Sequence, residues 1–129
     1  MGSEMCIRDS AKGFLSLVEE ALKDIPEVDV YQIKDRLDKG DNVNLIDVRE
    51  DNEWNLGRIP TAIHLGKGII ERDIESVAKN REMELILYCQ GGFRSALAAE
   101  SLKKMGYKNV YSMSGGFGTW AGNEFPISK

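Results

Sequence analysis

The sequence has few of the residues that hold metals or build disulfide frameworks. It contains two cysteines and one histidine among 129 residues. These numbers exclude a Cys₄ or Cys₂His₂ zinc site made by this chain alone, and they allow at most one disulfide bridge. We therefore expect no metal and no other cofactor, and we expect a reducing, cytoplasmic compartment.

Long apolar runs and an excess of positive charge are also missing. The longest apolar run, Leu85–Cys89, is far shorter than the roughly 20 residues that cross a bilayer, so we expect no contact with a membrane. Seventeen Lys and Arg residues against 21 Asp and Glu residues give a formal net charge of −4. An acidic chain without a basic tract argues against nucleic-acid binding, but a local site can still attract a small anion.

The N-terminal residues divide into two segments. Residues 1–10 lack the apolar core of a secretory signal, and Met5–Asp9 looks like a translated sequencing adapter. We expect this segment to be disordered or artefactual, and we assign Cys6 no role. Apolar residues at helical spacing before Pro26 predict an amphipathic packing helix within residues 11–27.

Short apolar segments alternate with helical patterns over residues 28–123, which we predict to be one domain, followed by a tail at 124–129. Strands are predicted at 28–30, 43–48, 62–65, 84–88 and 110–113, and helices at 31–39, 51–55, 69–78, 94–105 and 116–121. This order is typical of an α/β fold whose central, mostly parallel five-stranded sheet has helices on both faces. Ligands of such sheets bind beyond the carboxyl ends of the strands.

The segment that follows the strand at 84–88 has the residue types of a cysteine nucleophile. Glycines let the backbone turn its N–H groups inward, and the next helix adds partial positive charge at its N-terminus. Such surroundings favour the thiolate form of a cysteine, and an arginine can hold an anion. We therefore predict that Cys89 is catalytic. The predicted anion-binding loop consists of Gln90, Gly91, Gly92, Phe93, Arg94 and Ser95.

The spacing between Cys89 and Arg94 distinguishes two kinds of cysteine chemistry. Cysteine-dependent phosphatases place one residue more between the cysteine and the arginine than this sequence does. The smaller ring of amides suits a single extra sulfur on Cys89 better than a tetrahedral phosphate. The sequence also offers no obvious general acid, and sulfur transfer needs none because sulfite is a competent leaving group.

Four motifs in register resemble the rhodanese family of sulfurtransferases in its single-domain form. They are Leu45–Glu50, Glu53–Leu65, Cys89–Ser95 and Ser114–Trp120. The resemblance implies that Cys89 takes a sulfur from a small anionic donor such as thiosulfate. The resulting persulfide then passes this sulfur to a thiol, a sulfur carrier or cyanide. We expect a monomer or a weak homodimer.

The resemblance also assigns supporting residues near the loop. Asp47 is expected to accept hydrogen bonds from loop amides, and Arg49 to pair with a nearby carboxylate, with a plain surface ion pair as the alternative. Arg58 stands where the family commonly has histidine, and Gln90 where many members have a basic residue. Gln90 is expected to weaken thiosulfate binding or to change the donor preference. Arg58 is expected either to replace the hydrogen bonds of the histidine or to add charge near the site.

Several assignments stay open at the level of the sequence. Lys67 and Arg72 either attract the anionic donor or belong to a solvated face, and Phe93 either forms an apolar rim for a partner or packs internally. Two other functions also remain. One is a non-catalytic rhodanese-like module that binds a partner or senses redox state, and the other is a small cysteine-dependent phosphatase or arsenate reductase.

Overall fold

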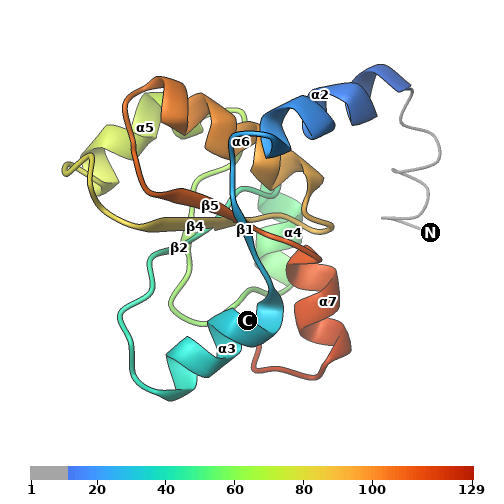
Figure 1. The fold of residues 1–129 in the computed structure, drawn as a ribbon. Helices are drawn as coiled ribbons and strands as arrows, with labels where there is room; N and C mark the ends of the chain where they lie inside the picture. Colours follow the sequence, from blue (N-terminus) through green and yellow to red (C-terminus); the bar gives the residue numbers. More distant parts are fainter. Residues whose placement is uncertain (1–11) are drawn as a thin grey trace.

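The computed structural model describes residues 12–129, which form the predicted α/β architecture (Figure 1). The strands are β1 (Glu27–Val28), β2 (Leu45–Asp47), β3 (Ile63–His64), β4 (Leu85–Tyr88) and β5 (Val110–Met113). The helices are α2 (Lys12–Leu22), α3 (Val30–Asp38), α4 (Asp51–Leu56), α5 (Ile70–Val77), α6 (Phe93–Lys104) and α7 (Gly116–Gly122). The expectations for residues 1–10, including Cys6, lie outside the described residues.

The five strands form one sheet in the order β1-β5-β4-β2-β3, and every neighbouring pair is parallel. The predicted five-stranded sheet is thus confirmed, and within residues 12–129 it is parallel throughout. Strand β4 lies at its centre, and all four of its residues are buried. Because the carboxyl ends of parallel strands meet at one edge, the chain segments that follow β2 and β4 lie side by side.

Helices cover both faces of the sheet, as the sequence predicts. In Figure 1, α2, α5 and α6 lie above the sheet, and α3 and α7 lie below it. Successive side chains of a strand point to opposite faces. Leu87 and Cys89 therefore belong to the core on one side, whereas Ile86 and Tyr88 pack with Trp120 on the other. Cys89 thus points toward the side of the sheet that α6 covers.

Helix α2 is the amphipathic helix predicted near the N-terminus, and it packs on α6. Val18 and Ala21 are buried against Ala96, near the start of α6. The Phe14 ring meets the Phe93 ring edge to face, with 6.4 Å between centroids. Phe93 is partly buried against α2, which favours the packing role over the apolar rim that the sequence left open.

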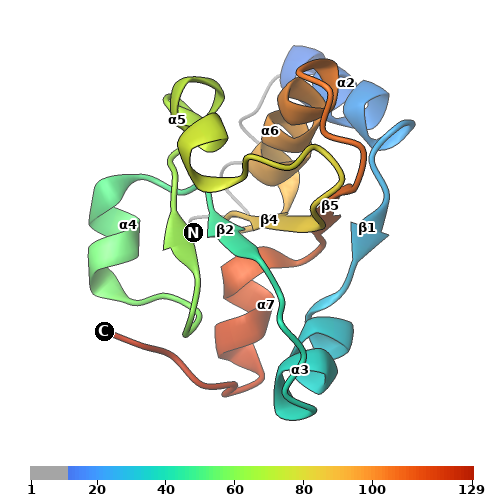
Figure 2. The same cartoon turned by 90° about the vertical axis from the view of Figure 1, so that its left-hand side faces the viewer.

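The last residues fold back onto the domain. The backbone of Ser128 exchanges two hydrogen bonds with Arg58, at 2.9 and 2.8 Å. The Trp120 indole N–H donates to the carbonyl of Pro126 at 2.8 Å. Figure 2 shows this C-terminal segment running from α7 toward α4. The segment expected as a tail therefore contacts α7 and the chain just after the end of α4.

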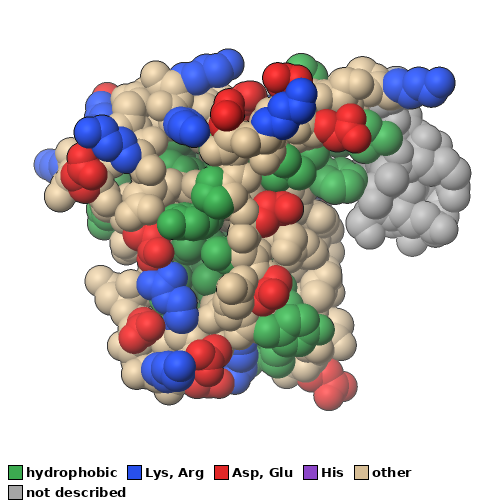
Figure 3. All heavy atoms as spheres, in the orientation of Figure 1, with side chains coloured by type: hydrophobic (Ala, Val, Ile, Leu, Met, Phe, Trp, Pro, Cys, Tyr) green, Lys and Arg blue, Asp and Glu red, His purple; other side chains and the backbone are tan. Residues whose placement is uncertain are grey.

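Charge is spread over the surface. Figure 3 shows acidic and basic side chains interspersed over one face, with neither sign covering a continuous area. Any attraction of an anion on the viewed face must therefore come from local groups.

None of the helices between residues 12 and 129 has both the length and the apolar character needed to span a lipid bilayer.

Candidate active site

Cys89 directly follows the central strand β4, and only 1% of it is exposed. Its Sγ atom accepts hydrogen bonds from the backbone N–H groups of Gly92 at 3.1 Å and Ser95 at 3.4 Å. The Ser95 hydroxyl lies 3.6 Å from Sγ and 2.7 Å from the hydroxyl of Ser112 on β5. Two backbone N–H groups from the start of α6 thus donate to the sulfur, an arrangement that stabilises negative charge on it.

The start of α6 explains how these amides reach the sulfur. Gly92 is the N-cap of α6 and has a left-handed φ of +98°. Ser95 is the third residue of the helix, where a backbone N–H has no partner within the helix. In most helices a capping side chain accepts from this position. Here the Cys89 sulfur occupies that place, so the helix N-terminus is directed at the candidate nucleophile.

Helix α7 holds the loop from the other side. The N–H groups of Phe117 and Gly118 donate to the carbonyls of Cys89 and Gln90, at 2.8 and 3.0 Å. Gly116, with φ of +59°, leaves no room for a side chain: an added Cβ would lie 2.6 Å from the Gln90 carbonyl oxygen and closer still to that of Cys89. The sequence drew attention to this motif only through the family resemblance. Its glycines allow α7 to approach the loop backbone.

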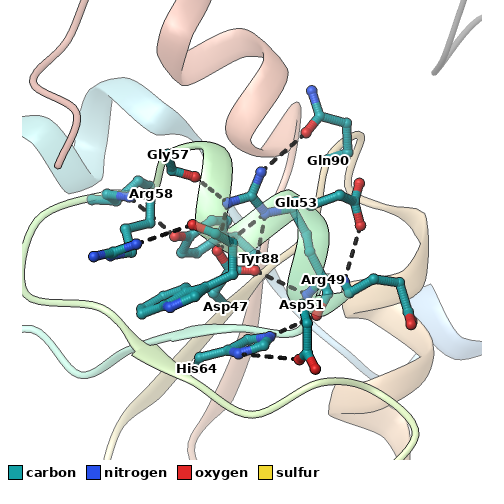
Figure 4. Close-up of polar contacts among 12 residues, drawn as sticks. Asp47, Arg49, Asp51, Glu53, Gly57, Arg58, His64, Tyr88 and Gln90 are labelled. Carbon is teal, nitrogen blue, oxygen red and sulfur yellow. Dashed lines mark hydrogen bonds and ion pairs between the residues drawn. The ribbon is translucent and has the colours of Figure 1, made fainter. Parts of the chain in front are cut away.

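Asp47 and Arg49 form an ion pair that is buried, with 0% and 2% of the residues exposed. The Arg49 guanidinium donates to both carboxylate oxygens of Asp47 at 2.8–3.0 Å and to the Gly57 carbonyl at 2.6 Å (Figure 4). The expected pairing of Arg49 with a carboxylate is therefore present, and it is not a surface pair. The loop-amide hydrogen bonds expected for Asp47 are not among those formed within residues 12–129, because Arg49 occupies both oxygens.

Arg49 connects this ion pair to the loop. Its Nη1 donates to Gln90 Oε1 at 3.4 Å, and its guanidinium lies 4.2 Å from the centre of the Phe117 ring. The Tyr88 hydroxyl also forms a hydrogen bond with the Asp47 side chain, and it accepts one from the Ile59 N–H at 3.1 Å. Burial and the Asp47 carboxylate raise the pKa of Tyr88 far above its ordinary value, so the hydroxyl keeps its proton.

Arg94 pairs with Glu53, a contact that the sequence did not predict. Its two terminal nitrogens each lie 3.1 Å from a different carboxylate oxygen of Glu53, which stands on α4. Glu53 also accepts from the N–H of Glu50, the N-cap of α4, at 3.0 Å. Burial by itself would raise the pKa of Glu53, but the hydrogen bonds from Arg94 and Glu50 hold it below the ordinary value. In the sequence, two signals mark Glu53: its place in the Glu53–Leu65 motif and the capping pattern that it forms with Glu50.

Arg58 turns toward Trp54 and not toward Cys89. Its Nη1 donates to the Trp54 carbonyl at 3.1 Å, and the guanidinium lies 4.6 Å from the centre of the indole ring. The Trp54 ring also stacks on the His64 ring, with 4.8 Å between centroids, and the His64 Nε2 lies 2.8 Å from the Arg49 carbonyl oxygen. Arg58 therefore contributes to a stack beside the Arg49 backbone.

Lys67 and Arg72 follow β3, and in the described part of the chain neither side chain forms a hydrogen bond or ion pair with the Cys89 loop. Arg72 is exposed and pairs with Asp73 at 2.7 Å. The Lys67 backbone N–H donates to the Val48 carbonyl at 3.0 Å. No group of three or more His, Cys, Asp or Glu side chains between residues 12 and 129 is placed to hold a metal ion.

Comparisons with known proteins agree with this architecture. A family described as "Rhodanese-like domain" matches residues 29–123. In Bacillus subtilis (strain 168), "Putative sulfurtransferase YtwF" is 34% identical over 103 residues, which cover 80% of this chain and 97% of that protein. "Putative sulfur carrier protein YrkF" of the same strain is 33% identical over 103 residues, and the match spans 55% of its length.

A solved structure is similar over nearly the whole chain. It is the "Protein of Unknown Function RPA3614, Possible Tyrosine Phosphatase, from Rhodopseudomonas palustris CGA009", with a TM-score of 0.84 and 28% sequence identity. The match covers 92% of this chain and 96% of that one.

Proposed function

The chain belongs to the family of rhodanese-like domains, and from that premise we propose that it is a sulfurtransferase that carries sulfur on Cys89. The names of its relatives, a sulfurtransferase and a sulfur carrier protein, support sulfur transfer. One observation carries the assignment to Cys89: its buried sulfur accepts two backbone N–H groups, at 3.1 and 3.4 Å, from the start of α6.

The proposed reaction has two displacements at sulfur. The Cys89 thiolate attacks the outer sulfur of thiosulfate, a new S–S bond forms, and the old S–S bond breaks so that its electron pair leaves with sulfite. An acceptor thiolate then attacks the outer sulfur of the Cys89 persulfide, and the Cys89 sulfur leaves as a thiolate. With cyanide as acceptor the product is thiocyanate. The Cys89 group carries one negative charge both as the thiolate and as the persulfide, so the same N–H donors can stabilise it in each state.

The supporting residues are assigned positioning roles. The Asp47–Arg49 pair would hold the loop through Gln90, and α7 would hold it through the Cys89 carbonyl. The side chains of Arg58 and Arg72 contact Trp54 and Asp73, so we give them no direct contact with the donor. Attraction of the anionic donor by Lys67 stays a prediction. We propose a thiol or sulfur-carrier acceptor, since these nucleophiles match the persulfide chemistry.

Initial rates of thiocyanate formation test the proposal. Varying thiosulfate at several fixed cyanide concentrations should give the parallel double-reciprocal lines of a ping-pong reaction. Cys89→Ser should abolish turnover, whereas Cys6→Ser should retain it. Activity that survives Cys89→Ser would contradict the proposal. Hydrolysis of an aryl phosphate that depends on Cys89, without any sulfur transfer, would favour the phosphatase function instead.

A further inference from the structure

The cation nearest in sequence to the candidate nucleophile is already partly neutralised. Arg94 and Glu53 meet through two N···O contacts of 3.1 Å, and about a quarter to a third of each side chain is exposed (31% and 27%). This fork-to-fork geometry uses both ends of the guanidinium. A donor that approaches Arg94 from the solvent therefore meets a cation and a carboxylate together.

Glu53 is held in this position by its own helix. Its Oε1 atom accepts from the Glu50 N–H at 3.0 Å, which closes the capping box at the start of α4. The carboxylate stays ionised at neutral pH, because the pKa of Glu53 lies below its ordinary value. The negative charge is thus a fixed part of the site when the donor arrives.

The charge of the sulfur donor determines how strongly the Glu53 carboxylate weakens its binding. Thiosulfate carries two negative charges. A thiosulfonate or an organic persulfide carries a single negative charge on the group that contains the outer sulfur. At about 6 Å in a site open to water, one unit charge changes the affinity for another by about threefold. Repulsion by Glu53 therefore weakens binding of a dianion by about tenfold and of a monoanion by about threefold.

We propose that Glu53 sets the donor preference of the Cys89 site: by neutralising Arg94, it disfavours dianionic thiosulfate and favours singly charged donors such as thiosulfonates and persulfides of organic thiols. This inference rests on the proposed function and names the class of donor for the same site. Glu53 acts through Arg94 and through its own charge, so it is a specificity-determining residue and takes no part in breaking the S–S bond.

The experiment compares two donors that deliver the same outer sulfur, thiosulfate and benzenethiosulfonate. Their dissociation constants are measured by calorimetry in the Cys89→Ser protein, where no sulfur can transfer, with and without Glu53→Gln. The glutamine keeps an oxygen that can accept from the Glu50 N–H. Glu53→Gln should tighten thiosulfate binding about tenfold and benzenethiosulfonate binding about threefold, so their ratio should shift about threefold.

Two further variants serve as controls. Glu53→Asp keeps the charge and should keep the unsubstituted preference between the donors. Glu82 forms a more exposed ion pair with Lys108 at 3.2 Å, and it precedes β4 whereas Cys89 follows it. Glu82→Gln removes the same charge at the opposite end of the strand, so it should leave the ratio unchanged.

A measurement without any Glu53 substitution keeps the test independent of folding. With Arg94 neutralised, the ratio of the two donor affinities should change little between low and high salt. A ratio that changes strongly with salt, equal effects of Glu53→Gln on both donors, or no binding of either donor would overturn the inference. If the ratio shifts as expected but no donor loads sulfur onto Cys89, then the proposed function fails while the donor preference stands.

Discussion

Replacing Gly116 by alanine should displace the Cys89 loop, although Gly116 lies in α7 and not in the loop. The new Cβ would lie 2.6 Å from the Gln90 carbonyl oxygen and closer still to that of Cys89. Both contacts are with backbone, which cannot swing away as a flexible side chain can. The loop or the start of α7 must therefore move, and the sulfur would lose its alignment with the N–H groups of Gly92 and Ser95.

The size of the effect follows from two contributions. A non-glycine residue in the left-handed conformation of Gly116, with φ of +59°, costs about 1–2 kcal/mol. Separation of α7 from the loop weakens the hydrogen bonds from Phe117 and Gly118, each worth about 0.5–1.5 kcal/mol. The free energy of unfolding should therefore fall by about 2–5 kcal/mol.

Other glycines of α7 provide a graded control. An added Cβ at Gly122 meets nothing within 4 Å, whereas one at Gly118 lies 3.2 Å from the Gln90 carbonyl oxygen. Gly122→Ala should leave stability within about 1 kcal/mol and leave sulfur loading unchanged, and Gly118→Ala should have an intermediate effect. Urea denaturation and the rate of persulfide formation measure both quantities. A Gly116→Ala protein that matches Gly122→Ala in both would refute the close approach of α7 to the loop.

Three further predictions concern the surroundings of the site. Asp47→Asn leaves the Arg49 charge buried beside a neutral amide, so urea denaturation should show a loss of about 3–5 kcal/mol, and an unchanged midpoint would contradict a buried pair. The pKa of Glu53 is lowered in the folded state. Its contribution to the free energy of unfolding should therefore be present above about pH 4.5 and disappear as the pH falls through the pKa of the folded state. The deficit of Glu53→Gln at neutral pH should therefore shrink in acid, and a constant deficit would argue against the ion pair. Phe14→Ala should lower the melting temperature and loosen α6 through Phe93, with a loss of about 1–3 kcal/mol, whereas Leu17→Ala, 60% exposed, should cost less than about 0.5 kcal/mol.

Much of the fold can be predicted because local patterns specify it. The strand at 110–113 was predicted with the bounds of β5, and the buried run that forms β4 was predicted within one residue. A strand buried on both faces must be continuously apolar, which points to a parallel sheet. Strand β2 is shorter than the predicted 43–48. Val43 and Val48 are buried like strand residues but lie outside the paired residues, so their apolar character extended the predicted strand at both ends.

The charge pairs of the site could not be predicted in the same way. Glu53 and Arg94 are 41 residues apart, and their contact depends on where α4 lies beside α6. With 17 basic and 21 acidic residues in the chain, many pairings are compatible with the sequence. The pairing of Arg49 with a carboxylate was predicted, but Asp47 was not identified as its partner: the turn after β2 brings Arg49 back onto that carboxylate.

Gly116 shows a further limit of the sequence. A glycine pair can serve a turn, a helix cap or a close approach of two backbones, and the residues around it do not distinguish these uses. Only the arrangement of α7 against the Cys89 and Gln90 carbonyls shows that close approach is the use made of it here.

The mass of the intact protein after incubation with a sulfur donor tests the central proposal most directly. Excess thiosulfate or benzenethiosulfonate should add the mass of one sulfur atom, and cyanide should then remove it. The sulfur should map to Cys89, so Cys6→Ser should still be loaded and Cys89→Ser should not. An unchanged mass with both donors, or a sulfur that persists in Cys89→Ser, would contradict the assignment of Cys89 as the sulfur carrier.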